Sequence, residues 1–196
     1  MYKLRSALIV SGWLLATSGG AEAQSSQNAN AAPYNSAVGF GVGLDKIDLL
    51  EGGSAGLTYF MGNYRFNFWD DEGGDTNVFE RRRQRLRGYA EVEAGYWKDS
   101  ELRPFTSDFL IGVNALAVAS AGSADVFFGG GFGAHFLKDE TGQNEDATEL
   151  GANLQFGIDL NLSQGFAVFT LGRFDLLTGN AFDAQTKIIG GVRAKF

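Results

Sequence analysis

The chain has 196 residues, enough for one domain, and it contains no cysteine, which excludes disulfide bonds and thiolate metal sites. Its formal net charge of −7 argues against a nucleic-acid partner, because such a partner calls for a basic face. Glycine (28) and phenylalanine (17) are abundant and proline (2) is rare, a composition that favours glycine-rich strands over helices.

The first 23 residues have the pattern of a secretory signal peptide. Lys3 and Arg5 form a basic start, and the apolar run 7–16 is too short to span a bilayer as a helix. Residues 21–23, Ala-Glu-Ala, fit the small-x-small cleavage rule. Cleavage there leaves 14 basic and 22 acidic residues, a net charge of −8. We therefore predict an exported protein, with residues 24–35 as a flexible polar lead.

Eight segments of alternating apolar and polar or glycine residues follow in chain order. Alternation of this kind predicts strands, because successive side chains of a strand point to opposite faces. The clearest is 149–162, in which every second residue is apolar over fourteen positions, longer than the strands of most soluble domains. The predicted strands are 37–44, 56–68, 85–97, 105–118, 125–137, 149–162, 166–176 and 185–196.

The connections between these strands alternate in length. Residues 120–124 and 163–165 form very short turns, whereas 45–53, 97–103, 138–148 and 177–183 are predicted loops. An even number of antiparallel strands with short turns at one end is typical of single-chain bacterial outer-membrane barrels. The connection 69–84 is too long for a plain turn, so either the flanking strands extend beyond the membrane or a small helix lies there.

The two faces of the predicted strands differ in composition. One face carries most of the phenylalanines, and the other carries glycine together with charged residues. Glycine indicates crowding, so we assign the glycine-rich, charged face to the lumen and the phenylalanine face to lipid. A charged side chain on the lipid face would cost roughly 2–4 kcal/mol near the bilayer centre. The fold class predicted is all-β, an eight-stranded antiparallel up-and-down transmembrane β-barrel over residues 36–196.

An eight-stranded barrel has an interior that side chains just fill, so the lumen charges are predicted to pair as a plug. Glu91 and Glu93 are expected to pair with Arg87, Arg173 or Arg193. An ion pathway through these charges is the alternative. Aromatic residues near strand ends are expected to form membrane-interface girdles; these are Tyr64, Phe68, Trp69, Tyr96 and Trp97.

Four features could mark a site of chemistry, but none of them predicts a catalytic, cofactor-binding or metal-binding residue. His135 is the only histidine and has no serine two residues on. The glycines of 129–133 lie in a strand pattern that no predicted helix follows, and a phosphate-binding loop requires such a helix. The acidic loop 138–148 lacks the spacing of a calcium loop. The basic cluster 81–83 is interpreted as a solvated or membrane-surface patch.

The chain resembles the small outer-membrane β-barrel family of Gram-negative bacteria, the OmpA transmembrane-domain and OmpX-like proteins. The resemblance rests on the final residues, IIGGVRAKF, and on the glycine-aromatic strand GGGFGAHF. In that family the terminal aromatic residue, here Phe196, is part of the signal read by the barrel assembly machinery. The resemblance implies architecture rather than a particular activity.

The functional expectation is an integral protein of the cell outer membrane, with a structural or surface-interaction role and no large pore. The alternatives are a lipid A-modifying outer-membrane enzyme and a small porin-like channel. The expected partners are outer-membrane lipids and lipopolysaccharide, periplasmic chaperones and the barrel assembly machinery, with no nucleic acid. The protein is expected to be a monomer without a cofactor.

Overall fold

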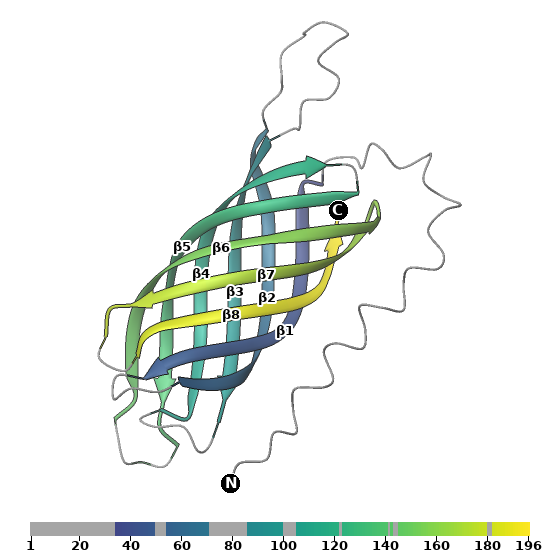
Figure 1. The fold of residues 1–196 in the computed structure, drawn as a ribbon. Helices are drawn as coiled ribbons and strands as arrows, with labels where there is room; N and C mark the ends of the chain where they lie inside the picture. The colour runs from purple at the N-terminus through teal and green to yellow at the C-terminus, as the bar shows by residue number, and fades with distance from the viewer. Residues whose placement is uncertain are drawn as a thin grey trace, which may run out of the picture. The chain divides into compact units, whose positions relative to one another are not determined.

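The computed structural model describes residues 34–49, 54–70, 86–99, 105–121, 123–140, 142, 145–179 and 182–196. In this part of the chain, eight strands form a closed barrel in which every strand pairs antiparallel with both neighbours, and β8 returns to β1 (Figure 1). The strands are β1 Ser36–Leu49, β2 Ser54–Asp70, β3 Leu86–Lys98, β4 Ser107–Ala121, β5 Ala124–Lys138, β6 Ala147–Ser163, β7 Phe166–Leu177 and β8 Phe182–Lys195. The predicted fold class is confirmed.

The stagger of the strands sets the width of the barrel. We start at Ala37 of β1 and step from each residue to its direct partner on the next strand. After eight steps this path returns to β1 at Ile47, ten residues further along the strand (47 − 37 = 10). The intermediate residues are Arg65, Glu91, Asn114, Gly131, Asn153, Asp175 and Gln185. With eight strands, this stagger gives a tilt of about 40° and a backbone radius of about 8 Å, which side chains can fill.

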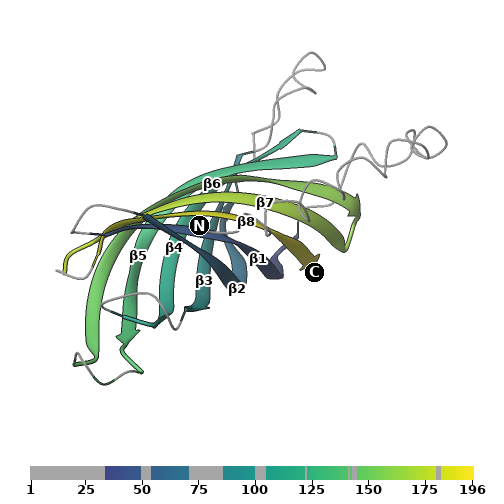
Figure 2. The same cartoon turned by 60° about the horizontal axis from the view of Figure 1, so that its bottom comes forward.

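The two ends of the barrel differ in their connections. At one end only two residues separate β4 from β5 and β6 from β7. The termini of the barrel meet at the same end, where the Ser36 amide donates to the Phe196 carbonyl oxygen at 2.8 Å. Because short turns lie on the periplasmic side of bacterial barrels, we name this the periplasmic end and the opposite one the outer end. Figure 2 shows the strands from another angle.

Side chains alternate between lumen and exterior along each strand. In β6, Leu154 and Phe156 are exposed at 57% and 65%, whereas Gln155 between them is fully buried. The same alternation leaves large apolar side chains exposed around the barrel, which we call the apolar belt. It includes Phe40, Phe60, Val113, Phe128, Phe132, Leu154, Phe156, Phe174 and Ile188. The predicted assignment of the phenylalanine face to the exterior is confirmed.

Among the described residues, no helix has the length and apolar character required to span a bilayer.

Two predictions about strand ends are wrong. Residue Asp45 was expected in a loop, but β1 continues to Leu49 and Asp45 is fully buried in the lumen. Trp97 was expected in an exposed girdle, but it lies on the lumen side of β3 and is also fully buried. Asp45 lies beyond the end of its predicted strand, whereas Trp97 is the last residue of its own; in both cases the period of two carries the side chain inward.

The remaining girdle residues are exposed on the exterior. Tyr64, Phe68, Trp69 and Tyr96 are each between 40% and 60% exposed. Phe68 and Trp69 are neighbours, yet both face outward because the β2–β3 register shifts between Asn67 and Trp69. A β-bulge of this kind places two consecutive residues opposite one, which breaks the alternation.

Several predicted segments lie outside the described residues. These are the signal peptide 1–23, most of the lead 24–35, the basic cluster 81–83 and the long connection between β2 and β3, whose helical or extended character is therefore still a prediction. Tyr34, near the end of the predicted lead, is described and buried at 6% exposure.

Candidate functional site

The lumen carries the polar side chains that could serve a function, and its periplasmic half is organised around Arg65. The Arg65 Nε donates to Glu91 Oε2 at 2.6 Å, and its Nη1 lies 3.7 Å from Asp159 Oδ2. Arg193 forms a second ion pair with Asp159. All four side chains are fully buried. Buried charges are tolerated only when paired and hydrogen-bonded, so the four residues depend on one another.

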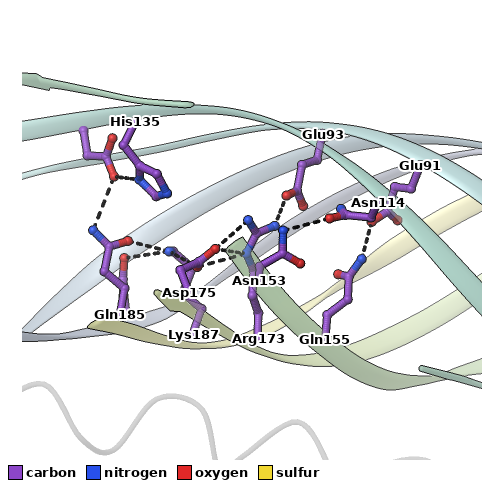
Figure 3. Close-up of polar contacts among 12 residues, drawn as sticks. Glu91, Glu93, Asn114, His135, Asn153, Gln155, Arg173, Asp175, Gln185 and Lys187 are labelled. Carbon is purple, nitrogen blue, oxygen red and sulfur yellow. Dashed lines mark hydrogen bonds and ion pairs between the residues drawn. The ribbon is translucent and has the colours of Figure 1, made fainter. Parts of the chain in front are cut away.

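Amide side chains complete the bonding of Glu91. Asn114 and Gln155 donate to its Oε1 at 3.1 and 2.8 Å, and Asn153 donates in turn to Asn114 at 2.9 Å (Figure 3). These bonds link four strands across the lumen: β3 with Glu91, β4 with Asn114, β6 with Gln155 and β2 with Arg65. Removing the Glu91 carboxylate would leave a buried guanidinium and two buried amides without this acceptor.

A second charged cluster lies between Glu91 and the outer end. Arg173 pairs with Glu93 and with Asp175, whose Oδ1 accepts from the Arg173 Nε at 2.8 Å. Lys187 donates to Asp175 Oδ2 at 2.7 Å and lies 3.6 Å from Asp45 Oδ2. Figure 3 shows Arg173, Asp175 and Lys187 pointing toward one another from β7 and β8.

At the outer end, His135 Nδ1 lies 2.7 Å from Asp108 Oδ2, and both side chains are buried. The Gln185 amide is 3.5 Å from the same carboxylate oxygen, and Gln185 Oε1 accepts from Lys187 at 2.5 Å. His135 is thus connected to the second cluster through Asp108, Gln185 and Lys187. Among the described residues, its Nε2 has no hydrogen-bond partner.

At the periplasmic end, Tyr34 is packed inside the barrel. Its ring stacks on Tyr89 with centroids 4.9 Å apart, and Tyr89 Oη donates to the Tyr34 carbonyl oxygen at 2.9 Å. Lys195 Nζ lies 4.5 Å from the centre of the Tyr34 ring and donates to Asp125 Oδ2 at 2.7 Å. Tyr34, just before β1, therefore fills part of this end of the lumen.

Apolar and aromatic side chains fill the space between the charged clusters. Arg65 stacks over the Phe127 ring at 4.1 Å and Arg193 over Phe169 at 4.4 Å. Tyr59, Leu110 and other buried side chains lie in the lumen beside the charged clusters. Flat guanidinium groups stack well on aromatic rings, which satisfies both charge and packing. Together with the paired charges, these contacts make the lumen a packed interior.

The predicted lumen pairs are confirmed in one case and corrected in others. Glu93 pairs with Arg173 as expected. Glu91 pairs with Arg65, which was predicted to face the lumen but not to be its partner. Arg193 pairs with Asp159, and Arg87 lies 3.8 Å from Asp70 at the periplasmic rim. The difference arises because the tilt brings together residues from strands whose stagger the sequence pattern does not specify.

Packing and surface contacts account for the glycine run 129–133 and for the described part of the acidic loop 138–148. Gly131, in the glycine run, lies so close to the Val113 carbonyl oxygen that a Cβ would not fit. In the acidic loop, Glu140 accepts from Lys98 at 2.6 Å and Asp146 accepts from the Asp139 amide at 3.3 Å. The described residues hold no group of three or more side chains with the geometry of a metal site.

A closed eight-stranded barrel with a charged lumen, an apolar belt and short turns at one end defines a class of protein. The chain has the architecture of the bacterial outer-membrane β-barrels, whose exterior contacts lipid and whose interior is polar.

Comparison with known proteins agrees with this class. No family model and no curated protein matches the sequence. Among solved structures, Neisserial surface protein A superimposes with a TM-score of 0.64 at 15% identity, covering 83% of this chain and 97% of that one. The attachment invasion locus protein Ail of Yersinia pestis gives 0.56 at 14% identity, covering 84% and 100%. The N-terminal β-barrel domain of Pseudomonas aeruginosa OprF gives 0.57 at 10% identity, covering 83% and 98%. The chain thus shares the fold of small Gram-negative outer-membrane barrels.

Proposed function

We propose that the protein is an integral outer-membrane barrel with a structural or surface-interaction role and a lumen that does not form a large pore. The observation that carries the proposal is the packed lumen. Charged side chains from all eight strands pair within the lumen, and Tyr34 packs against Tyr89 at the periplasmic end. A rigid, closed barrel of this kind is suited to presenting its outer connections while keeping the membrane sealed.

The placement in the membrane is tested by cell fractionation. The mature protein is expected in the outer-membrane fraction, released only by detergent, with a gel mobility that changes on heating as the barrel unfolds. The apolar belt is the physical reason, since it would be exposed to water in a soluble protein. A protein that stays soluble without detergent would contradict the proposal.

We further propose that Phe196 contributes to recognition by the barrel assembly machinery. Phe196 is 65% exposed at the end of the last strand, beside the first residues of the barrel. Deletion of Phe196 is expected to reduce the amount of folded protein in the outer membrane several-fold, as measured by the heat-dependent gel shift. Deletion of residues 25–28 from the lead serves as control. Unchanged assembly without Phe196 would reject this role.

An enzymatic role in modifying lipid A is the second candidate, and one observation favours it. His135 and Asp108 have the arrangement of a base and the group that orients it. Both are buried in the lumen, however, and no hydroxyl nucleophile of the described residues is hydrogen-bonded to His135. The structural role is therefore the better supported of the two.

Replacement of His135 by alanine is expected to leave the lipid A profile of the cells unchanged, because the imidazole faces the packed lumen rather than the membrane. Mass spectrometry of lipid A from cells with wild-type protein, the variant and no protein provides the measurement. A modification present with the wild type and lost in the His135→Ala strain, at equal amounts of folded protein, would establish the enzymatic role instead.

A further inference from the structure

An outward-facing groove lies at the outer end of the barrel, where β3, β4 and β5 approach the start of β6. Its volume is ≈ 470 Å³, within the range of roughly 300–1,000 Å³ typical of small-molecule sites. The groove is separate from the lumen clusters. Its lining includes Tyr96, Phe109 and Phe136 on one side and Lys138, Glu140 and Asp146 on the other.

The apolar side of the groove is aromatic. Phe109 of β4 is paired directly with Tyr96 of β3 and with Phe136 of β5. The rings of Phe109 and Phe136 lie 6.3 Å apart and are tilted by 33°. All three side chains are 40–43% exposed and continue the apolar belt toward its outer edge. They therefore offer a flat surface to an acyl chain or to the apolar face of a sugar ring.

The polar side is held in place by its own contacts. Glu140 accepts from Lys98 Nζ at 2.8 and 2.6 Å, and its amide donates to Thr106 Oγ1 at 3.0 Å. Thr106 in turn donates to the Lys138 carbonyl oxygen at 3.1 Å. The segment that carries Lys138 and Glu140 is thus tied to the start of β4 before any ligand binds, which lowers the cost of ordering it.

The mixture of charges on the polar side indicates the kind of head group. One cation, Lys138, and two carboxylates, Glu140 and Asp146, line the groove together with the Thr148 hydroxyl. Because Glu140 is already paired with Lys98, a head group would meet one charge of each sign, those of Lys138 and Asp146. Sugar hydroxyls both donate and accept hydrogen bonds, so they match carboxylates, a hydroxyl and an ammonium at once.

We propose that this groove is a binding site for one glycolipid of the outer leaflet. The acyl chains lie on Phe109 and Phe136, and the sugar head reaches Lys138, Glu140 and Asp146. The site spans the boundary between the apolar belt and the aqueous loops, as an amphiphile does. The inference rests on the proposed function only for the position of the barrel in the membrane.

Native mass spectrometry of the full mature chain in detergent tests the proposal, with hexa-acylated monophosphoryl lipid A as the probe. A saturable one-to-one complex is expected. Phosphatidylethanolamine with chains of equal length is expected to bind about ten-fold more weakly, because it lacks the hydroxylated sugar. Equal retention of the two lipids would overturn the assignment to a glycolipid.

Variants locate the site. The double variant Phe109→Ala, Phe136→Ala is expected to weaken lipid A binding about ten-fold, the scale of losing two aromatic contacts. The matched control is Phe128→Ala, Phe132→Ala, which removes two exposed rings from β5 outside the groove and should leave binding unchanged. Equal loss, or equal retention, in the two double variants would overturn the proposal.

A second kind of variant fills the groove with a larger side chain instead of removing its aromatic rings. Thr148→Trp places a large side chain in the lining, at the exposed residue of β6 that pairs with Phe136, and is expected to abolish the one-to-one complex. Retained binding in this variant overturns the proposal even where the double alanine variant fails to fold. Heat-dependent gel mobility and outer-membrane fractionation are measured on every variant. If the wild-type protein does not bind lipid A but shows normal gel mobility and outer-membrane fractionation, the glycolipid site is rejected and the proposed function is not affected.

Discussion

Replacing Glu91 with alanine is expected to lower the free energy of unfolding by about 3–5 kcal/mol, the range for removing one partner of a buried ion pair. The loss is large because Arg65 is fully buried and keeps only the more distant Asp159, while Asn114 and Gln155 also lose their acceptor. Urea unfolding in detergent micelles, followed by the gel shift between folded and unfolded forms, measures it.

The control for Glu91 is the same substitution at an exposed ion pair. Glu140 pairs with Lys98 at the outer end, where both side chains are more than 40% exposed. Glu140→Ala is expected to leave the unfolding midpoint close to that of the wild type, because solvent screens such pairs and hydrates the remaining charge. Equal unfolding midpoints for the two variants would mean that the lumen charges are hydrated rather than packed.

Two adjacent glycines of β8 provide the second large effect. Gly191 faces the lumen, and a Cβ there would collide with the Phe40 carbonyl oxygen and lie 2.7 Å from the Gly41 Cα. Both obstacles are backbone atoms of the neighbouring strand, so no side-chain rotation relieves the contact. Gly191→Val is therefore expected to abolish the folded band in the heat-dependent gel shift, an effect beyond the usual ~1–3 kcal/mol of overpacking.

Its neighbour Gly190 faces the exterior, where the nearest atom to an added Cβ is the Phe169 carbonyl oxygen at 3.9 Å. Gly190→Val is expected to fold like the wild type, because valine suits a strand and here meets lipid. The pair tests the assignment of the two faces with one residue type in one strand. Folding of Gly191→Val together with failure of Gly190→Val would reverse that assignment.

The alternation of apolar and polar residues along the sequence predicts much of the architecture. The alternation in 149–162 is unbroken, so the inward position of Gln155 and the outward positions of Leu154 and Phe156 follow from it directly. The crowded face is also readable, because glycine and charge occur together on it. What the pattern specifies is the face of each side chain and the number of strands.

The ends of strands and the choice of partners depend on the tertiary structure. Asp45 looked like part of a loop because it is charged, but Lys187 on β8 lies beside it in the lumen. Trp97 continues the inward series of Glu91, Glu93 and Gly95, although tryptophan is more common at the membrane interface. The partner of Glu91 depends on the ten-residue stagger, which no single strand encodes.

The outer groove was likewise not predictable from the pattern. The sequence pattern places Lys138, Glu140 and Asp146 only in an acidic loop. Their role in the groove depends on the contacts of Thr106 with Lys138 and Glu140, which join segments 32 and 34 residues apart. Cross-strand pairing places Phe109 beside Phe136, but the bonds between the loops give the site its polar side.

The central claim is that paired charges and packed side chains close the lumen, and single-channel recording in planar bilayers tests it most directly. The purified, folded protein is expected to insert without producing the large, steady current steps of an open aqueous pore. Loss of Glu91 is expected to raise the frequency of small openings, since the cluster it holds together spans the lumen. Steady, large conductance from the wild-type protein, at the same insertion level, would contradict the account.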